Sequence, residues 1–203
     1  MVFHLGAITQ VLDSLKDPYK THQINIIGTT NFLENIRKLN PKIVFIYSSS
    51  DKAYGELNKR NFYTENDCLK SDYPYDVSKS ASDLICQSYS KTYDLKVGII
   101  RCGNIFGPGD FNLKRLIPEV ILSTLKNKRF VIRSNGKSTR DYVYVEDVVK
   151  AYVLLMNKLL NSSIKLRTYN VSSNFNYSVK EVVSIILKFM KATKPAACWA
   201  YFS

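Results

Sequence analysis

The stretch "KIVFIYSSSDKAYG", from Lys42 to Gly55, joins an apolar run to a turn that is crowded with polar groups. Residues 43–47 are all β-branched or aromatic, and such a short run predicts a strand that is buried in a sheet. Residues 48–55 then bring hydroxyls, one carboxylate and one amine together directly behind that strand. The stretch therefore predicts a sheet whose strand ends carry side chains suited to chemistry.

Short β-branched runs alternate with longer amphipathic segments over the rest of the chain. We expect strands at residues 2–5, 43–47, 97–101 and 130–133, and further strands from Asp141 and from Thr168. We expect helices at residues 17–39, 73–93, 113–126, 146–160 and 179–191, the first of them opened by Asp17 and Pro18 as N-cap and first-turn residue. This alternation is typical of an α/β fold in which helices cover a parallel sheet.

The regular pattern loosens beyond Gly107, where short strands and loops predominate. We therefore divide the chain into a first region at residues 1–107, a second region at 108–191 and a tail at 192–203. The tail has no periodicity that continues the preceding helix, so we expect it to be frayed or foreign to the fold.

Composition and charge exclude several classes of protein. The four cysteines, Cys68, Cys86, Cys102 and Cys198, form no CxxC pair, and with two histidines they suggest neither a disulfide framework nor a zinc site. The net charge of +12 is compatible with a phosphorylated substrate, a nucleic acid or a biased composition. The lysines are scattered and no nucleic-acid motif is present, so we expect no nucleic-acid partner. No apolar stretch approaches the ~20 residues of a membrane helix, and we expect a cytoplasmic protein without a membrane partner.

Tyr75 and Lys79 lie four residues apart at the start of an expected helix, and this spacing puts both side chains on one helix face. A tyrosine acts as a base near neutrality only if its pKa falls from about 10 to about 7, which takes about 4 kcal/mol of differential stabilisation. A neighbouring ammonium supplies part of this. Because ligands bind at the carboxyl ends of parallel strands, we expect Ser48–Ser50, Tyr75 and Lys79 to converge beside a bound dinucleotide.

Several segments together resemble the NAD-dependent epimerase/dehydratase family, which belongs to the extended short-chain dehydrogenases/reductases and acts on nucleotide-sugars. The matching segments are "VFHLGA", "INIIGTTNFLENIRK", "SSSDKAYG", "YDVSK", "RCGNIFGPGD", "RLIPEVI", "GKSTRDYVYVEDVV" and "YNVSS". They cover the chain from Val2 to about Lys191. The resemblance implies a Rossmann-like sheet with helices on both faces and a smaller C-terminal substrate-binding region.

The same resemblance implies roles for individual residues. Tyr75 would be the catalytic base, Lys79 would lower its pKa and bind the nicotinamide ribose, and Ser50 would approach the sugar O4. The residues lining NAD would be Leu5, Gly6, Ala7 and Ser48, together with Tyr75 and Lys79. The residues facing the nucleotide-diphosphate sugar would be Asn104, Arg115, Leu116, Arg133 and Arg140. For Arg115 and Arg133, a solvated surface charge is the alternative.

Asp51 and Lys52 favour one reaction within the family. Members that only epimerise C4 usually place small uncharged residues after the serine, whereas the 4,6-dehydratases place an acid and a base there. The Asp-Lys version most resembles the CDP-glucose 4,6-dehydratases of polysaccharide biosynthesis, which are lyases. We expect Asp51 as the acid and Lys52 as the base or enolate stabiliser. The alternatives are a nucleotide-sugar 4-epimerase, a non-catalytic fragment and, for the two charges, a solvated salt pair.

The chain departs from the family pattern at both ends. The glycine-rich G-x-G-x-x-G or G-x-x-G-x-x-G that cradles the pyrophosphate is absent, and Met1 falls almost where the family's fourth strand would begin. We therefore expect a fragment, with the first strands encoded upstream or supplied by a separate N-terminal chain. The resemblance also implies a homodimer formed through the helices around residues 17–40 and 73–93.

Overall fold

The apolar run that precedes the polar turn forms an inner strand of a four-stranded parallel sheet in a computed structural model of the chain. β2 (Phe45–Ser50) pairs with β1 (Val2–His4) and β3 (Val97–Cys102), and β7 (Leu166–Val171) pairs with β3. The structure describes residues 1–56, 62–132, 134–191 and 197–199. The predicted α/β fold with a parallel sheet is confirmed.

Two compact units share the chain. The first unit contains Met1–Gly103 and Asp147–Val171, and the second contains Asn104–Glu146 and Ser172–Ser203. The chain thus leaves the first unit after Gly103, and returns to it for a helix and the strand β7.

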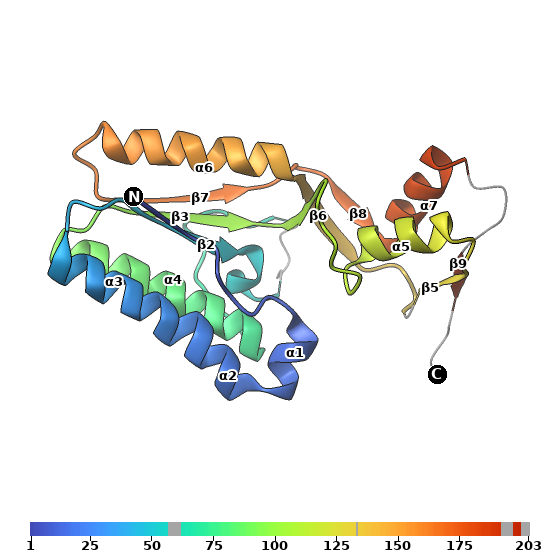
Figure 1. The fold of residues 1–203 in the computed structure, drawn as a ribbon, viewed down its shortest axis with the longest axis horizontal. Helices are drawn as coiled ribbons and strands as arrows, with labels where there is room; N and C mark the ends of the chain where they lie inside the picture. Colours follow the sequence, from blue (N-terminus) through green and yellow to red (C-terminus); the bar gives the residue numbers. More distant parts are fainter. Residues whose placement is uncertain (57–61, 133, 192–196, 200–203) are drawn as a thin grey trace. The chain divides into compact units, whose positions relative to one another are not determined.

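Helices cover both faces of the sheet in the first unit (Figure 1). α3 (Gly28–Leu39) and α4 (Pro74–Tyr93) lie on one face, and α6 (Val145–Leu160) runs along the other. Gly98 in β3 lets α6 approach closely, because a Cβ at this position would lie 2.8 Å from a methyl carbon of Leu155. The first face is sealed by an apolar cluster: Leu33, Ile36, Phe45, Tyr47, Cys86, Leu95, Val97 and Ile99.

The first long helix is confirmed, with a break in its regularity. It consists of α2 (Pro18–His22), a π-helical segment η1 (Gln23–Ile27) and α3. The Asp17 side chain accepts a hydrogen bond from the backbone N of Lys20 at 2.9 Å, so the predicted N-cap is present. A shorter helix that we did not predict, α1 (Val11–Lys16), precedes it.

Short elements build the second unit. β4 (Asn104–Phe106), β6 (Thr139–Tyr144) and β8 (Asn176–Ser178) form a three-stranded sheet. β5 (Phe130–Ile132) pairs in parallel with β9 (Ala197–Trp199). The helices α5 (Leu116–Leu125) and α7 (Val179–Phe189) pack together over Val120, Phe130, Ile132 and Val183.

Two predicted boundaries were wrong by three residues, and the prediction for the tail was wrong in part. β2 continues to Ser50 because its ladder with β3 extends as far as the Ser50–Cys102 pair, which the polar residues concealed. α5 begins at Leu116 instead of residue 113, since the preceding segment forms a turn in which Arg115 N donates to Asn112 O. Part of the tail, Ala197–Trp199, is a paired strand instead of a frayed end, because backbone pairing needs no side-chain periodicity.

Among the cysteines whose side chains the structure describes, Cys86 and Cys102 are buried, whereas Cys68 is exposed. Among the described residues, no helix is both long enough and apolar enough to cross a membrane.

Candidate active site

Lys79 lies buried on α4 and is directed at the carboxyl end of β2. Its side chain is 4% exposed, and Nζ donates a hydrogen bond to the backbone O of Ser48 at 2.7 Å. The same Nζ lies 5.1 Å from the centre of the Tyr47 ring. Burial lowers the pKa of Lys79 to about 8. The site therefore holds a lysine amine whose protonated form is disfavoured by burial. This amine lies next to the strand end at which the sequence predicted a site.

Tyr75 occupies the first turn of α4, one helical turn before Lys79, and is 9% exposed. The hydroxyl of Ser78 donates to the backbone O of Tyr75 at 2.7 Å and thereby supports this turn. α4 packs against both β2 and the turn that follows it. Tyr75 and Lys79 thus lie buried one helical turn apart on α4, and Lys79 contacts the backbone of Ser48.

Ser50, the last residue of β2, begins the turn. It caps the short 3-10 helix η2 (Asp51–Tyr54), because its Oγ accepts a hydrogen bond from the backbone N of Lys52 at 3.2 Å. The same hydroxyl donates to Oδ1 of Asp51 at 2.9 Å. All three serines belong to the strand β2 and pair with β3, and Ser50 is the last residue of the strand.

The loop after β1 is held by a residue that the sequence analysis did not select, Asn25 of η1. The backbone N of Ile8 donates to Asn25 Oδ1 at 2.8 Å, and Asn25 Nδ2 donates to the backbone O of Ile8 at 3.0 Å and to the hydroxyl of Ser78 at 2.8 Å. Asn25 is 1% exposed. It therefore fixes the segment that contains Leu5, Gly6 and Ala7 against α4. The sequence feature that could have indicated this role is Asn25, the asparagine that opens the segment "NIIGT", because an asparagine does not contribute to an apolar core.

A buried ion pair fixes the polar turn from the other side. Arg101 of β3 donates from Nε and Nη2 to the two carboxylate oxygens of Asp83 at 2.8 and 2.9 Å. The same guanidinium donates from Nη1 to the hydroxyl of Tyr54 at 2.7 Å, and this hydroxyl donates to Asn170 Oδ1 at 2.7 Å. One arginine thus links β3, α4 and η2. Sequence analysis missed it, because a charged residue at a strand end usually points to solvent.

Asp76, next to Tyr75, was also missed. Its side chain is 8% exposed, and its Oδ1 is buried with no hydrogen-bond partner among the described residues. Burial raises the pKa of Asp76, the nearby charge of Lys52 opposes that rise, and Asp51 and Asp72 add to it. No local sequence pattern signals the burial of this carboxyl group.

The residues expected to face a sugar nucleotide lie in the second unit. Asn104 begins β4, and its Nδ2 donates to the backbone O of Asp141 at 3.3 Å. Arg140 lies on the adjacent strand β6 and donates to the backbone O of Thr139 at 2.7 Å. Arg115 is the N-cap residue of α5, pairs with Asp110 at 3.2 Å, and precedes Leu116. Arg133 lies outside the described residues.

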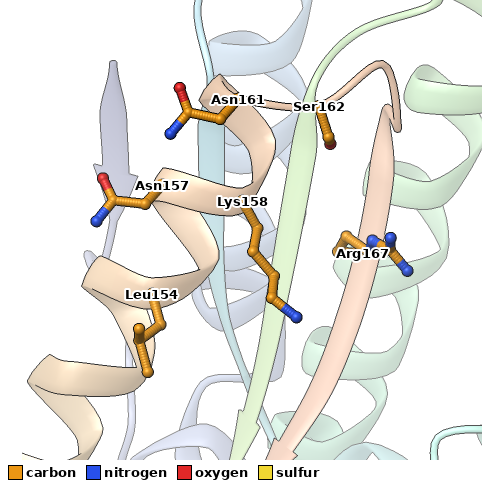
Figure 2. A pocket seen from close by; sticks show the side chains of 6 residues that line it. All are labelled: Leu154, Asn157, Lys158, Asn161, Ser162 and Arg167. Carbon is orange, nitrogen blue, oxygen red and sulfur yellow. The ribbon is translucent and has the colours of Figure 1, made fainter.

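A hollow of about 460 Å³ lies near the carboxyl end of α6 (Figure 2). It is lined by Leu154, Asn157, Lys158, Asn161, Ser162 and Arg167. Arg167 is the second residue of β7, whereas Ser50 is the last residue of β2, so the hollow lies at the opposite end of the parallel sheet from the polar turn. Lys158 stands in the last turn of α6, where a cation is favoured by the helix dipole. The hollow is therefore separate from the candidate site.

Comparisons with known proteins identify relatives over nearly the whole chain. The model of the "NAD dependent epimerase/dehydratase family" matches residues 1–172. A dTDP-D-glucose 4,6-dehydratase of Dictyostelium discoideum is 34% identical over 92% of this chain and 44% of its own length. A UDP-glucose 4-epimerase of Mycoplasma genitalium is 32% identical over 93% of this chain and 60% of its own length. The chain thus spans about half the length of these curated relatives.

Solved structures of both kinds of enzyme also match nearly the whole chain. A dTDP-glucose 4,6-dehydratase from Bacillus anthracis in complex with NAD has a TM-score of 0.85 and 29% identity, and the match covers 99% of this chain and 60% of that chain. A UDP-glucose 4-epimerase from Thermotoga maritima with UDP-glucose has a TM-score of 0.88 and 27% identity, over 98% of this chain and 64% of that chain. Both reactions are therefore represented among proteins with this fold.

Proposed function

Because the chain belongs to the NAD dependent epimerase/dehydratase family, we propose that it carries the reacting part of an NAD-dependent nucleotide-sugar 4,6-dehydratase, a lyase. The observation that carries this proposal is the turn that follows β2. There Ser50 binds Asp51 and caps the helical turn of Lys52, beside the helix that holds Tyr75 and Lys79. This arrangement offers a hydroxyl, an acid and an amine next to a tyrosine and a buried lysine.

The residues that would hold the nicotinamide end of NAD are Leu5, Gly6, Ala7, Ser48, Tyr75 and Lys79. They fit such a group, since a Cβ at Gly6 would meet no other atom within 4 Å, which leaves open space beside a backbone that Asn25 holds in place. The chemistry that a bound NAD would supply is hydride transfer, from the sugar C4 to the cofactor and back to C6. The family's glycine-rich pyrophosphate loop is not part of this sequence.

Tyr75 takes the proton of the sugar O4 in the proposed reaction. A cation one helical turn away favours an ionised phenol, and Lys79 provides that cation while its ammonium is held by the backbone O of Ser48. Ser50 supplies a hydroxyl that can hydrogen-bond O4. These three groups would assist the oxidation of C4, with NAD as hydride acceptor, in either reaction of the family, so they do not by themselves select between the two reactions.

Asp51 and Lys52 select the dehydratase. After oxidation at C4, loss of water needs a base for the C5 proton and an acid for the departing C6 hydroxyl, and the turn offers both kinds of group. Epimerisation at C4 needs neither. By the Asp-Lys resemblance, we propose a CDP-hexose as substrate, with Asn104, Arg115, Leu116, Arg133 and Arg140 facing it. A cytoplasmic homodimer is part of the same proposal.

Product analysis tests this function. The chain is incubated with NAD and a nucleotide-linked glucose, and the sugar is analysed by mass spectrometry and NMR. A 4-keto-6-deoxy product is expected, and a C4 epimer with an intact C6 hydroxyl would instead establish the 4-epimerase. Asp51→Asn should stop at the 4-keto sugar that still carries its C6 hydroxyl, whereas complete dehydration by this variant would refute the scheme. Asp147→Asn, at an exposed ion pair on α6, is the matched control.

Calorimetry distinguishes the proposed enzyme from the second alternative, a non-catalytic binding module. It predicts no heat of NAD binding to the unaltered chain, whereas the proposed function predicts binding that Lys79→Met weakens.

A further inference from the structure

A buried carboxyl group beside the tyrosine lacks a hydrogen-bond partner. Asp76 is 8% exposed, and its Oδ1 has no hydrogen-bond partner in the described parts of the chain. Buried polar atoms in folded proteins nearly always have a partner, since an unsatisfied carboxylate loses its hydration without compensation. At a candidate active site, a buried carboxyl group without a hydrogen-bond donor indicates that the group binds a proton or a reacting molecule.

The charges around Asp76 belong to the same turn that selects the dehydratase. Lys52 and Asp51 act on it from η2, and Asp72 acts on it from the segment before α4. η2 and α4 pack against each other, so these groups form one cluster in the first unit. Asp51, Lys52 and Asp76 thus belong to one cluster of ionisable side chains at the turn, and Asp72 also influences it.

Asp51 and Asp76 differ in their surroundings. Asp51 is partly exposed and accepts a hydrogen bond from the hydroxyl of Ser50 at 2.9 Å. Asp76 is buried, and its Oδ1 accepts no such bond. When two nearby carboxyl groups share a site, the one without hydrogen-bond donors is the one on which a proton is retained.

We propose that Asp76 is a positioning residue that retains the proton used in the elimination step and delivers it through Asp51. This inference rests on the proposed dehydratase function and changes the source of the proton in it. Asp51 then touches the C6 hydroxyl and passes on the proton, while Asp76 restores it.

The step balances without any further reactant. The C5–H bond breaks, its proton goes to Lys52 in the amine form, and its electron pair becomes the C5–C6 double bond. The C6–O bond breaks, and the leaving hydroxyl takes the proton that the ionised Asp51 has first received from Asp76, so water departs and both carboxyl groups are left ionised. Afterwards the proton on Lys52 returns to Asp76, and the cluster has its starting charge.

A titration tests the cluster without any substrate. The chain is labelled with ¹³C at aspartate carboxyl groups and followed by NMR from acid to neutral pH. Asp76 should titrate above the ordinary aspartate value of about 3.9, and Lys52→Gln should move the Asp76 titration further upward. Lys150→Gln, on α6, should leave it unchanged. Titration of Asp76 at the ordinary aspartate value, or no response to Lys52→Gln, would overturn the proposal.

The reaction supplies the second readout. Asp76→Asn should slow the loss of water by about 100-fold, the usual range for a lost acid, and leave oxidation at C4 intact. Asp76→Glu should recover part of the rate, and Asp147→Asn, at an exposed carboxyl group on α6, should have no effect. Unaltered dehydration by Asp76→Asn refutes this role. Failure of the proposed function is distinguishable, because it appears as the absence of dehydrated sugar from the unaltered chain while the titration stands.

Discussion

Removal of one partner from the Arg101–Asp83 pair should destabilise the first unit strongly. The side chains are 3% and 0% exposed, and the pair is bidentate, with distances of 2.8 and 2.9 Å. Asp83→Asn leaves the guanidinium buried without a counter-charge, and breaking a buried pair in this way costs about 3–5 kcal/mol. This loss is a large share of the free energy of unfolding of an ordinary domain, which is about 5–15 kcal/mol.

The expected loss is measured by urea denaturation followed by circular dichroism. Asp83→Asn should lower the midpoint markedly, because a loss of about 3 kcal/mol shifts it by 1 M or more at the usual m-values of about 1–3 kcal/mol/M. The double variant Asp83→Leu/Arg101→Met should recover most of that loss, since apolar residues of similar volume replace a buried pair at little net cost.

Asp147→Asn serves as the control for the buried pair. Its partner is Lys150, and both side chains are more than 60% exposed, at 62% and 68%. Exposed pairs contribute little, so this variant should unfold with the unaltered chain. An equally small effect of Asp83→Asn would refute the reasoning, because it would mean that the pair is hydrated in solution.

Three further predictions concern single residues of the site. Because burial raises the pKa of Asp76, the charge of this carboxylate destabilises the fold above that pKa. Asp76→Asn should therefore raise the free energy of unfolding at pH 7. This gain should vanish below about pH 4, where the carboxyl group is protonated in the unfolded chain too. Burial lowers the pKa of Lys79 from 10.5 to about 8, so the stability of the unaltered chain relative to Lys79→Met should rise by about 3 kcal/mol between pH 8 and 10.5 in denaturation series. Gly55→Ala should destabilise the turn and increase proteolysis within it, because φ is +82° and a Cβ would lie 1.6 Å from the backbone O of Lys70; Gly6→Ala, with no atom within 4 Å, should be tolerated.

The elements that the sequence predicted well are those that local patterns specify. Apolar runs such as residues 43–47 and the amphipathic period of residues 73–93 report burial directly, because a strand or helix repeats its exposure every two or 3.6 residues. The second unit was predicted less well. Its strands β4 and β8 have three residues each, too few for any period to appear.

The residues of the candidate site were likewise predicted where a short local segment marks them and missed where it does not. Ser50, Asp51, Lys52, Tyr75 and Lys79 stood in short recognisable segments, and the structure places them around one strand end. Asn25, which holds the backbone of Ile8, was not selected, because that contact spans 17 positions of sequence.

By itself, the sequence determined that a parallel sheet covered by helices carries a polar turn, a tyrosine and a lysine at its strand ends. These features follow from side-chain order along the chain. Only the tertiary structure decided that Arg101 pairs with Asp83 beneath the turn and that Asp76 Oδ1 is buried with no hydrogen-bond partner in the part of the chain that the structure describes. The physical reason is that burial and hydrogen bonding depend on which segments pack against each other, and a carboxyl group has the same letter whether water or protein surrounds it.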